Sequence, residues 1–294
     1  MNSPRIHKAS FGDGTGWLIS GGELLSRGGS ALLRVVLVLL AISLVQVVPL
    51  IGTLALMLIS PALTAGMLNV FRSVQQRETP GIETVLAGLS DGRSRRALLL
   101  LGAFFIIGLF AAIGALSAWL APQMDMQALT EFLNDPEAMN DNPEQLLALF
   151  QGVNVFGGLA LAAVVLALVL GGLYFAVPLV FFWRWPVFTA LLWSLRALLV
   201  NWLAFLGFGL VVVGVFLLAG ITFAIISGIV SLALGNAGVF LVQLLSMALS
   251  LFLQLLIAAA QWRSFVQVFP AGDGGDDHGD DDGDQNREDD ALTL

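Results

Sequence analysis

The chain has 294 residues, of which 57% are hydrophobic and only 12% are charged, and its mean hydropathy is +0.89. A soluble globular domain carries about 25% charged residues. So little charge cannot cover the surface of a soluble protein of this size. The composition therefore excludes a soluble enzyme, a nucleic-acid-binding protein and a disordered chain, and it indicates an integral membrane protein.

The counts of cysteine and histidine limit the reactions that the chain could catalyse, and the position of the acidic residues explains the net charge of −8. The chain has no cysteine, which excludes disulfides and thiolate chemistry, and its two histidines, His7 and His278, lie in polar terminal segments. Ten acidic residues lie in the segment 271–294, so the rest of the chain is near +1. We expect a disordered acidic tail. The first 30 residues lack the basic and then apolar pattern of a signal peptide.

Long stretches without any charged residue or histidine locate the membrane spans. A helix needs about 20 apolar residues to cross roughly 30 Å of hydrocarbon, so a much longer stretch crosses twice. Four such stretches occur, at 35–71, 97–124, 145–183 and 197–262.

Arginines at the ends of these stretches set the orientation. Arg34 and Arg72 flank the first stretch, and Arg196 and Arg263 flank the last. The positive-inside rule places all four in the cytoplasm, so each of these stretches must cross twice. The turns are expected near Pro49 and at the Gly-Asn-Ala-Gly sequence 235–238.

The resulting topology has six spans with both termini in the cytoplasm. The predicted segments are a cytoplasmic N-terminal segment 1–15, a membrane domain 16–269 with spans at about 31–48, 50–71, 97–120, 153–183, 202–233 and 237–262, an acidic external loop 121–151, and a cytoplasmic tail 270–294.

A short amphipathic segment precedes each pair of spans, at 16–27, 82–89 and 186–197. In the second segment Ile82, Val85 and Leu89 recur at helical spacing, which is typical of a helix that lies in the membrane interface. The predicted fold is all-α: a polytopic membrane bundle of six transmembrane helices, arranged as three hairpins, each preceded by a cytoplasmic interfacial helix.

Short apolar motifs also resemble a known family. They are the segment 60–67 before Phe71 and Arg72, the segment 176–180 followed by Pro186, and the segment 194–197 with Asn201. These motifs resemble uncharacterised six-span inner-membrane proteins of Gram-negative bacteria, distantly YciC-like, and the membrane domain of some glycerophosphodiester phosphodiesterases. The resemblance covers roughly residues 16–269 and implies the bacterial inner membrane but no reaction. The acidic tail departs from the family, and no phosphodiesterase domain is present.

The predicted spans carry little reactive chemistry. Intramembrane ionisable residues mark proton relays and ion paths, yet these spans hold none except Arg34, which lies near a helix end. They also lack paired carboxylates and histidines. We therefore expect no enzyme activity, no catalytic residue, no cofactor and no metal site.

Arginines near the cytoplasmic ends of the predicted spans form the first candidate site. Each basic residue near an anionic leaflet contributes about 1 kcal/mol of attraction. The charges could set the topology alone, or they could recognise an anionic lipid headgroup. The candidate contacts are Arg72, Arg77, Arg93, Arg95, Arg96, Arg184 and Arg196.

Polar residues within the last predicted span form the second candidate site. Gln243, Ser246, Ser250 and Gln254 fall on one helix face. Such residues supply hydrogen bonds between helices, or they line a polar cavity.

Two other features of the spans need an explanation. Pro61 and Pro178 predict kinks, because proline removes a helix hydrogen bond; the kinks serve packing or mark a transport site. Tryptophans near the cytoplasmic span ends are predicted to anchor in the headgroup region.

These observations favour an inner-membrane protein without enzyme activity that binds lipid or organises membrane partners. The expected partners are membrane lipids and either another membrane protein or a second copy of the chain, and no nucleic acid. The alternative is a channel or transporter for a neutral or amphiphilic solute.

Overall fold

The computed structural model describes residues 5–43, 45, 48–134 and 150–270. This part of the chain is helical and contains no strand. The elements in order are α1 (Phe11–Ser43), α2 (Ile51–Gln75), α3 (Ile82–Ser90), α4 (Arg95–Leu120), the 3₁₀ turn η2 (Ala121–Gln123), α5 (Met126–Asn134), α8 (Val155–Trp183), α9 (Val187–Val200), α10 (Trp202–Leu234) and α11 (Asn236–Val268).

Six of these helices are long and apolar enough to cross a membrane: α1, α2, α4, α8, α10 and α11. The expected all-α, multi-pass membrane fold is therefore confirmed. The helices α10 and α11 have 33 residues each. At 1.5 Å per residue each is about 50 Å long, so it tilts in a hydrocarbon layer of about 30 Å or extends beyond it.

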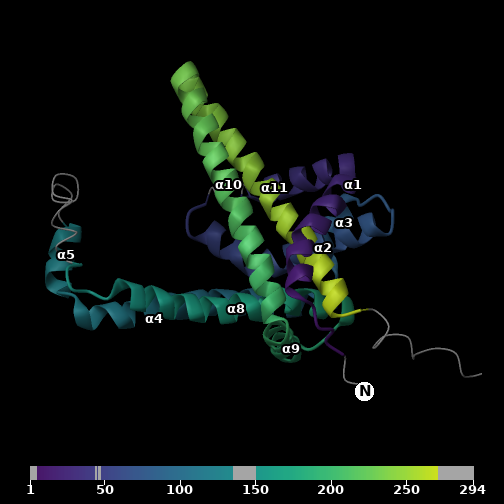
Figure 1. Cartoon of the computed structure of the whole chain (residues 1–294), viewed down its shortest axis with the longest axis horizontal. Helices are drawn as coiled ribbons and strands as arrows, with labels where there is room; N and C mark the ends of the chain where they lie inside the picture. Colours follow the sequence, from purple (N-terminus) through teal and green to yellow (C-terminus); the bar gives the residue numbers. More distant parts are fainter. Residues whose placement is uncertain (1–4, 44, 46–47, 135–149, 271–294) are drawn as a thin grey trace, which may run out of the picture.

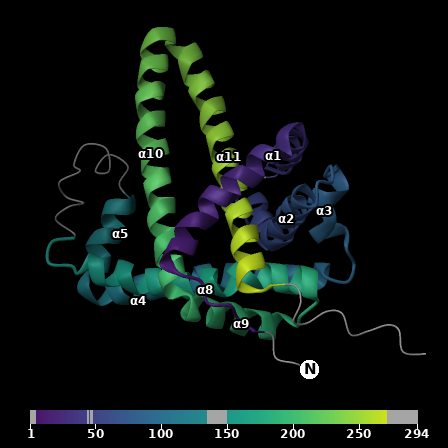
Figure 2. The same cartoon turned by 45° about the vertical axis from the view of Figure 1, so that its right-hand side comes forward.

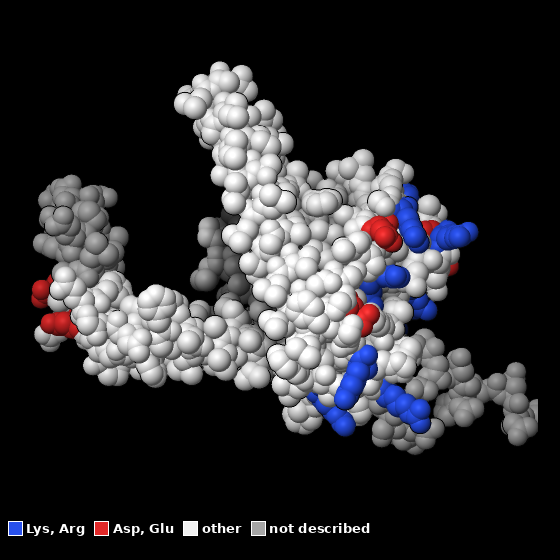
Figure 3. Space-filling view, in the orientation of Figure 1, with Lys and Arg blue, Asp and Glu red and all other residues white. Residues whose placement is uncertain are grey.

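The long helices diverge from a shared end. The helix α4 packs along α8, and α10 packs along α11. Figures 1 and 2 show these two pairs extending in different directions, while α1, α2, α3 and α9 gather where the pairs meet. The space-filling view shows an open hollow between the two arms (Figure 3).

A tight turn joins α10 to α11. Gly235 connects α10 directly to α11 with φ 54°, a left-handed conformation that glycine adopts without a steric penalty. This turn lies at the predicted breaker sequence. The chain enters α2 through Leu50, close to the predicted turn at Pro49, while residues 44 and 46–47 lie outside the described part.

All three short amphipathic segments are helical, but the first is not a separate helix. It is the N-terminal part of α1, which is interrupted only at Gly29 (φ 46°, ψ −132°). Each segment packs on a long helix: α3 on α2, α9 on α8 and the first segment of α1 on α11. The helices α3 and α9 each pack on the long helix that precedes them in the chain. The first segment of α1 packs instead on α11, the last helix.

Backbones approach closely where these segments meet the long helices. A Cβ added at Gly66 of α2 would lie 1.7 Å from the Val85 carbonyl oxygen of α3. A Cβ at Gly88 of α3 would lie 2.1 Å from the Ala62 carbonyl oxygen of α2. The absence of side chains at both glycines therefore allows α3 to lie directly on the backbone of α2.

Two of the tryptophans predicted as lipid anchors are core residues instead. Trp17 and Trp262 are 2% and 6% exposed. Their indole N–H groups donate to the side chains of Gln267 (2.7 Å) and Gln75 (2.6 Å), so the polar edge of each ring is bonded within the protein. Trp202 is 59% exposed and stays available at the surface.

The two ends of the described chain lie side by side. The His7 amide donates to the Val268 carbonyl (3.0 Å), and the Ala9 amide donates to the Asn201 side chain (2.6 Å). Residues 1–4 of the predicted N-terminal segment, 135–149 of the acidic loop and 271–294 of the tail lie outside the described residues.

Candidate functional site

Charge is segregated along the molecule. In Figure 3 the lysines and arginines gather around the shared end of the helices. At the far end of the α4–α8 pair the charged residues drawn are acidic. These acidic residues are Asp125 and Glu131, which lie beside and within α5. The shared end is therefore the basic end of the protein.

All seven candidate arginines are exposed. Several lie at helix ends: Arg72 is in the last turn of α2, Arg184 caps α8, and Arg95 and Arg96 begin α4. The structure brings the ends of α2, α4 and α8 together, and we call this exposed set, with Arg77, Arg93 and Arg196, the arginine rim.

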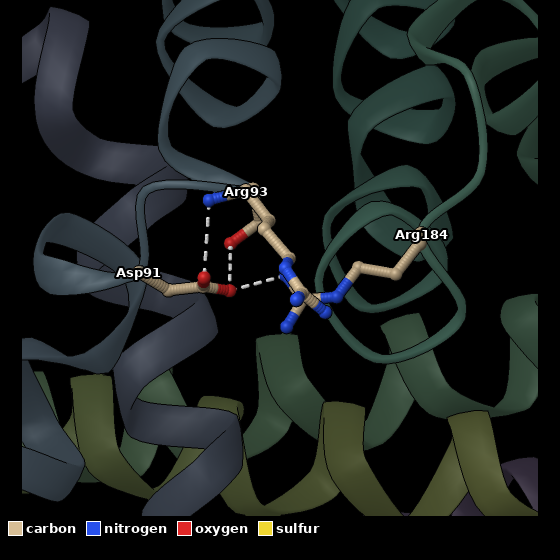
Figure 4. Close-up of polar contacts among 4 residues, drawn as sticks. Asp91, Arg93 and Arg184 are labelled. Atoms are coloured by element: carbon tan, nitrogen blue, oxygen red, sulfur yellow. Dashed lines mark hydrogen bonds and ion pairs between the residues drawn. The ribbon is translucent and has the colours of Figure 1, made fainter.

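Asp91 organises the centre of the arginine rim (Figure 4). Its carboxylate accepts from the Arg93 amide (3.1 Å), the Ser94 hydroxyl (2.8 Å) and the Arg184 guanidinium. Burial alone would raise the pKa of the Asp91 carboxyl, but these hydrogen bonds and the charge of Arg184 outweigh it and lower the pKa below its usual value. The carboxylate ties the α3–α4 turn to the end of α8.

The sequence interpretation missed this role of Asp91. The signal was present, because Asp91 is the one acid in the segment 90–96, beside three arginines. Its partner Arg184 is separated by 93 positions in sequence, which no local pattern could identify.

Aromatic rings hold three of the guanidinium groups. Arg72 lies over Phe182 (5.4 Å to the ring centre), and Arg196 lies over Trp193 (5.0 Å). Arg184 lies over Phe181 at 5.8 Å. Each such contact contributes about 0.5–1 kcal/mol at an exposed site. Among the described residues, Arg184 is the one rim arginine with an ion-pair partner, which is Asp91.

The start of α4 is suited to an anion. The Asp91 carboxylate, which lies just before the helix, offsets only one of the arginine charges around it. Ser94 makes no side-chain cap, and the first turn has no acidic residue. The positive end of the helix dipole therefore adds to the charges of Arg93, Arg95 and Arg96, an arrangement that favours a bound anion.

The helix α9 presents an apolar outer face beside the arginine rim. Ala190, Ser194 and Ala197 are buried against the rest of the protein. On the outside Phe188 and Leu199 are 72% and 71% exposed. Such a face is suited to acyl chains when an adjacent cation meets the headgroups.

The two carbonyls that Pro61 and Pro178 leave without a helix partner accept other hydrogen bonds. Pro178 lacks an N–H, so the Tyr174 carbonyl has no helix partner; Gln261 of α11 donates to it at 2.6 Å. Pro61 frees the Met57 carbonyl in the same way, and the Ser60 hydroxyl donates to it at 2.8 Å. Donors within the protein therefore satisfy both carbonyls.

The structure divides the predicted polar stripe of α11. The hydroxyls of Ser246 and Ser250 donate to carbonyls of their own helix, those of Gln243 and Ser246. Gln243 and Gln254 are exposed. Of these four residues only Ser250 and Gln254 line a cavity, which lies between α2, α10 and α11.

Other residues provide the polar contacts between helices. Ser194 of α9 accepts from the Phe175 amide (2.9 Å) and donates to the Gly171 carbonyl (2.6 Å), so its hydroxyl is inserted into the hydrogen-bond ladder of α8. The Tyr174 hydroxyl bonds Ser264 of α11 at 3.0 Å. Ser194 and Asn201 belong to the motifs that carry the family resemblance, and here both have structural roles.

Within the described residues no group of three His, Asp or Glu could hold a metal ion. No protein-family model, curated protein or solved structure matches the chain.

Proposed function

We propose that this protein is a bacterial inner-membrane protein without enzyme activity that binds anionic lipid headgroups at the arginine rim. The observation that carries the proposal is the convergence of seven exposed arginines at one end of six membrane-length helices. At about 1 kcal/mol for each charge near an anionic leaflet, the rim would attract several kcal/mol in total.

The orientation follows from the same charge distribution. The described lysines and arginines gather at the shared end, where both ends of the described chain also lie. The positive-inside rule assigns this end to the cytoplasm. The anionic cytoplasmic leaflet would then lie beside the rim, with α9 and α3 at its interface.

Native mass spectrometry of the full chain in detergent tests this proposal. The protein is mixed with equal amounts of dioleoyl phosphatidylglycerol and dioleoyl phosphatidylcholine. We expect wild type to retain the anionic lipid selectively, and the triple variant Arg93→Gln/Arg95→Gln/Arg96→Gln to lose most of that selectivity.

The matched control removes three basic residues outside the arginine rim, in the variant Arg5→Gln/Lys8→Gln/Arg27→Gln. This control should keep the selectivity. Equal loss in both triple variants would reduce the effect to net charge, and no selectivity in wild type would refute the proposal. Solute flux in liposomes would instead favour the alternative, a transporter.

A further inference from the structure

We infer that the cavity between α2, α10 and α11 binds the uncharged, hydroxyl-bearing end of an acylglycerol. This site is separate from the arginine rim in its residues and in its chemistry. The proposal goes beyond the proposed function and does not depend on it.

The cavity has a volume of about 380 Å³. Sites for small molecules range from about 300 to 1,000 Å³, so it is large enough for a glycerol group and the start of a chain. Met67 of α2, Phe216 of α10 and Leu253 of α11 supply apolar walls. Its long wall is α11, on which Gln254 lies about 21 Å from the helix end at Val268. That depth places the cavity within the hydrocarbon layer, where a soluble metabolite has no direct access.

The polar groups that line the cavity determine the hydrogen bonds a ligand must make. The Thr64 hydroxyl donates to the Ser60 carbonyl (2.9 Å), and the Ser250 hydroxyl donates to the Ser246 carbonyl (2.8 Å). Each has already used its only proton, so its oxygen can only accept. A ligand must therefore bring O–H donors.

Gln254 adds the complementary group. Its amide makes no hydrogen bond with any described residue, although it lies in the middle of an apolar helix. An amide without a partner in an apolar environment costs several kcal/mol on hydrocarbon scales. It can donate to an ester or hydroxyl oxygen and accept from a hydroxyl, so it matches a glycerol ester on both counts.

The lining also selects against charge. None of the described residues that line the cavity is ionisable: the polar ones are hydroxyls and amides. A phosphate or carboxylate there would be desolvated without a counter-charge, which is strongly unfavourable. The cavity is open rather than closed, so an acyl chain can extend from it into the surrounding hydrocarbon.

The test uses native mass spectrometry of the full chain in detergent, titrated with 1-oleoylglycerol. The comparison ligand is 1-oleoylglycerol 3-phosphate, which adds only the charged group. We expect wild type to bind 1-oleoylglycerol, and Gln254→Leu to weaken that binding about fivefold, the effect of losing one neutral hydrogen bond.

Gln243→Leu is the matched control, because Gln243 is the same residue type, exposed on the same helix, but outside the cavity. It should bind like wild type. The arginine-rim triple variant should also keep 1-oleoylglycerol binding while it loses the phosphate-bearing ligand. Unchanged binding in Gln254→Leu, or equal loss in Gln243→Leu, would overturn the cavity assignment and leave the arginine rim unaffected.

Because Gln254 is exposed, its substitution should not prevent folding. A thermal unfolding midpoint no lower than that of wild type establishes this for each variant. A wild-type protein that binds only the phosphate-bearing compound would contradict the inference directly.

Discussion

The hydrogen bond between Gln261 and α8 makes the sharpest stability prediction. Pro178 leaves the Tyr174 carbonyl without its helix partner, and the Gln261 amide supplies the missing donor at 2.6 Å. Gln261 is only 8% exposed. Substituting Gln261→Leu keeps the approximate volume and leaves the carbonyl without a donor.

The magnitude follows from the carbonyl that loses its partner. An unsatisfied buried acceptor costs about 1–3 kcal/mol, while hydrogen bonds between membrane helices average about 0.6 kcal/mol with a maximum near 1.7. We expect Gln261→Leu to lower the free energy of unfolding by about 1–2 kcal/mol. In a Pro178→Ala background the alanine N–H can bond the carbonyl, so the same substitution should cost less than about 0.5 kcal/mol.

Equilibrium unfolding in mixed micelles of a mild detergent and dodecyl sulfate measures the four proteins of this double-mutant cycle. The packing loss of Pro178→Ala appears in both backgrounds and therefore cancels in the coupling energy. Strictly additive free energies would refute the proposed link between the proline and the glutamine.

Three further predictions concern packing and charge. Gly66→Val should prevent α3 from docking on α2, because the new Cβ would lie 1.7 Å from a carbonyl oxygen, whereas Gly114→Val, with nothing within 4 Å, should be tolerated; size-exclusion profiles of both variants test this. Ser194→Ala should destabilise the protein by about 1–2 kcal/mol, because its buried hydroxyl bonds two groups of α8, while Ser227→Ala should be neutral in the same micelle unfolding assay. The lowered pKa of Asp91 stabilises the fold above its unfolded value of 3.8, and this contribution is lost as the pH falls through the folded-state pKa. Melting temperatures between pH 5 and 2 should therefore fall more steeply with acid in wild type than in Asp91→Asn, and equal slopes would contradict this.

Local patterns were enough to predict six long apolar helices, although α1 ends at Ser43, before the predicted end of the first span at 48. Hydropathy is a property of about 20 consecutive residues, so it locates a span without knowledge of its neighbours. The glycine at position 235 likewise acts on its own segment, and the structure places the α10–α11 turn there. The sequence also predicted that one end of the protein is basic, because the arginines at the span ends are adjacent to those spans in sequence.

Contacts between side chains that are far apart in sequence could not be predicted from these patterns. Trp17 and Trp262 are of the residue type that anchors spans at the membrane interface. In the structure they are buried, and their indole N–H groups donate to Gln267 and Gln75, partners that are far away in sequence. The role of Gln261 depends on a proline-freed carbonyl that lies 87 positions away in sequence.

The predicted polar stripe shows the same limit. Helical spacing places Gln243 and Gln254 on one face, but spacing cannot show where a neighbouring helix lies. The cavity between α2, α10 and α11 lies beside Gln254 and Ser250, so only that end of the stripe lines it.

Labelling of single cysteines tests the central claim most directly, namely that the arginine rim faces the cytoplasm while the far ends of the helix pairs face outward. The chain has no cysteine, so each introduced one reports alone. In spheroplasts a membrane-impermeant maleimide should label Gln127→Cys and Asn236→Cys at the far ends, and should label Gln76→Cys, beside the rim, only after lysis. Labelling of Gln76→Cys together with the other two in intact spheroplasts would contradict the account.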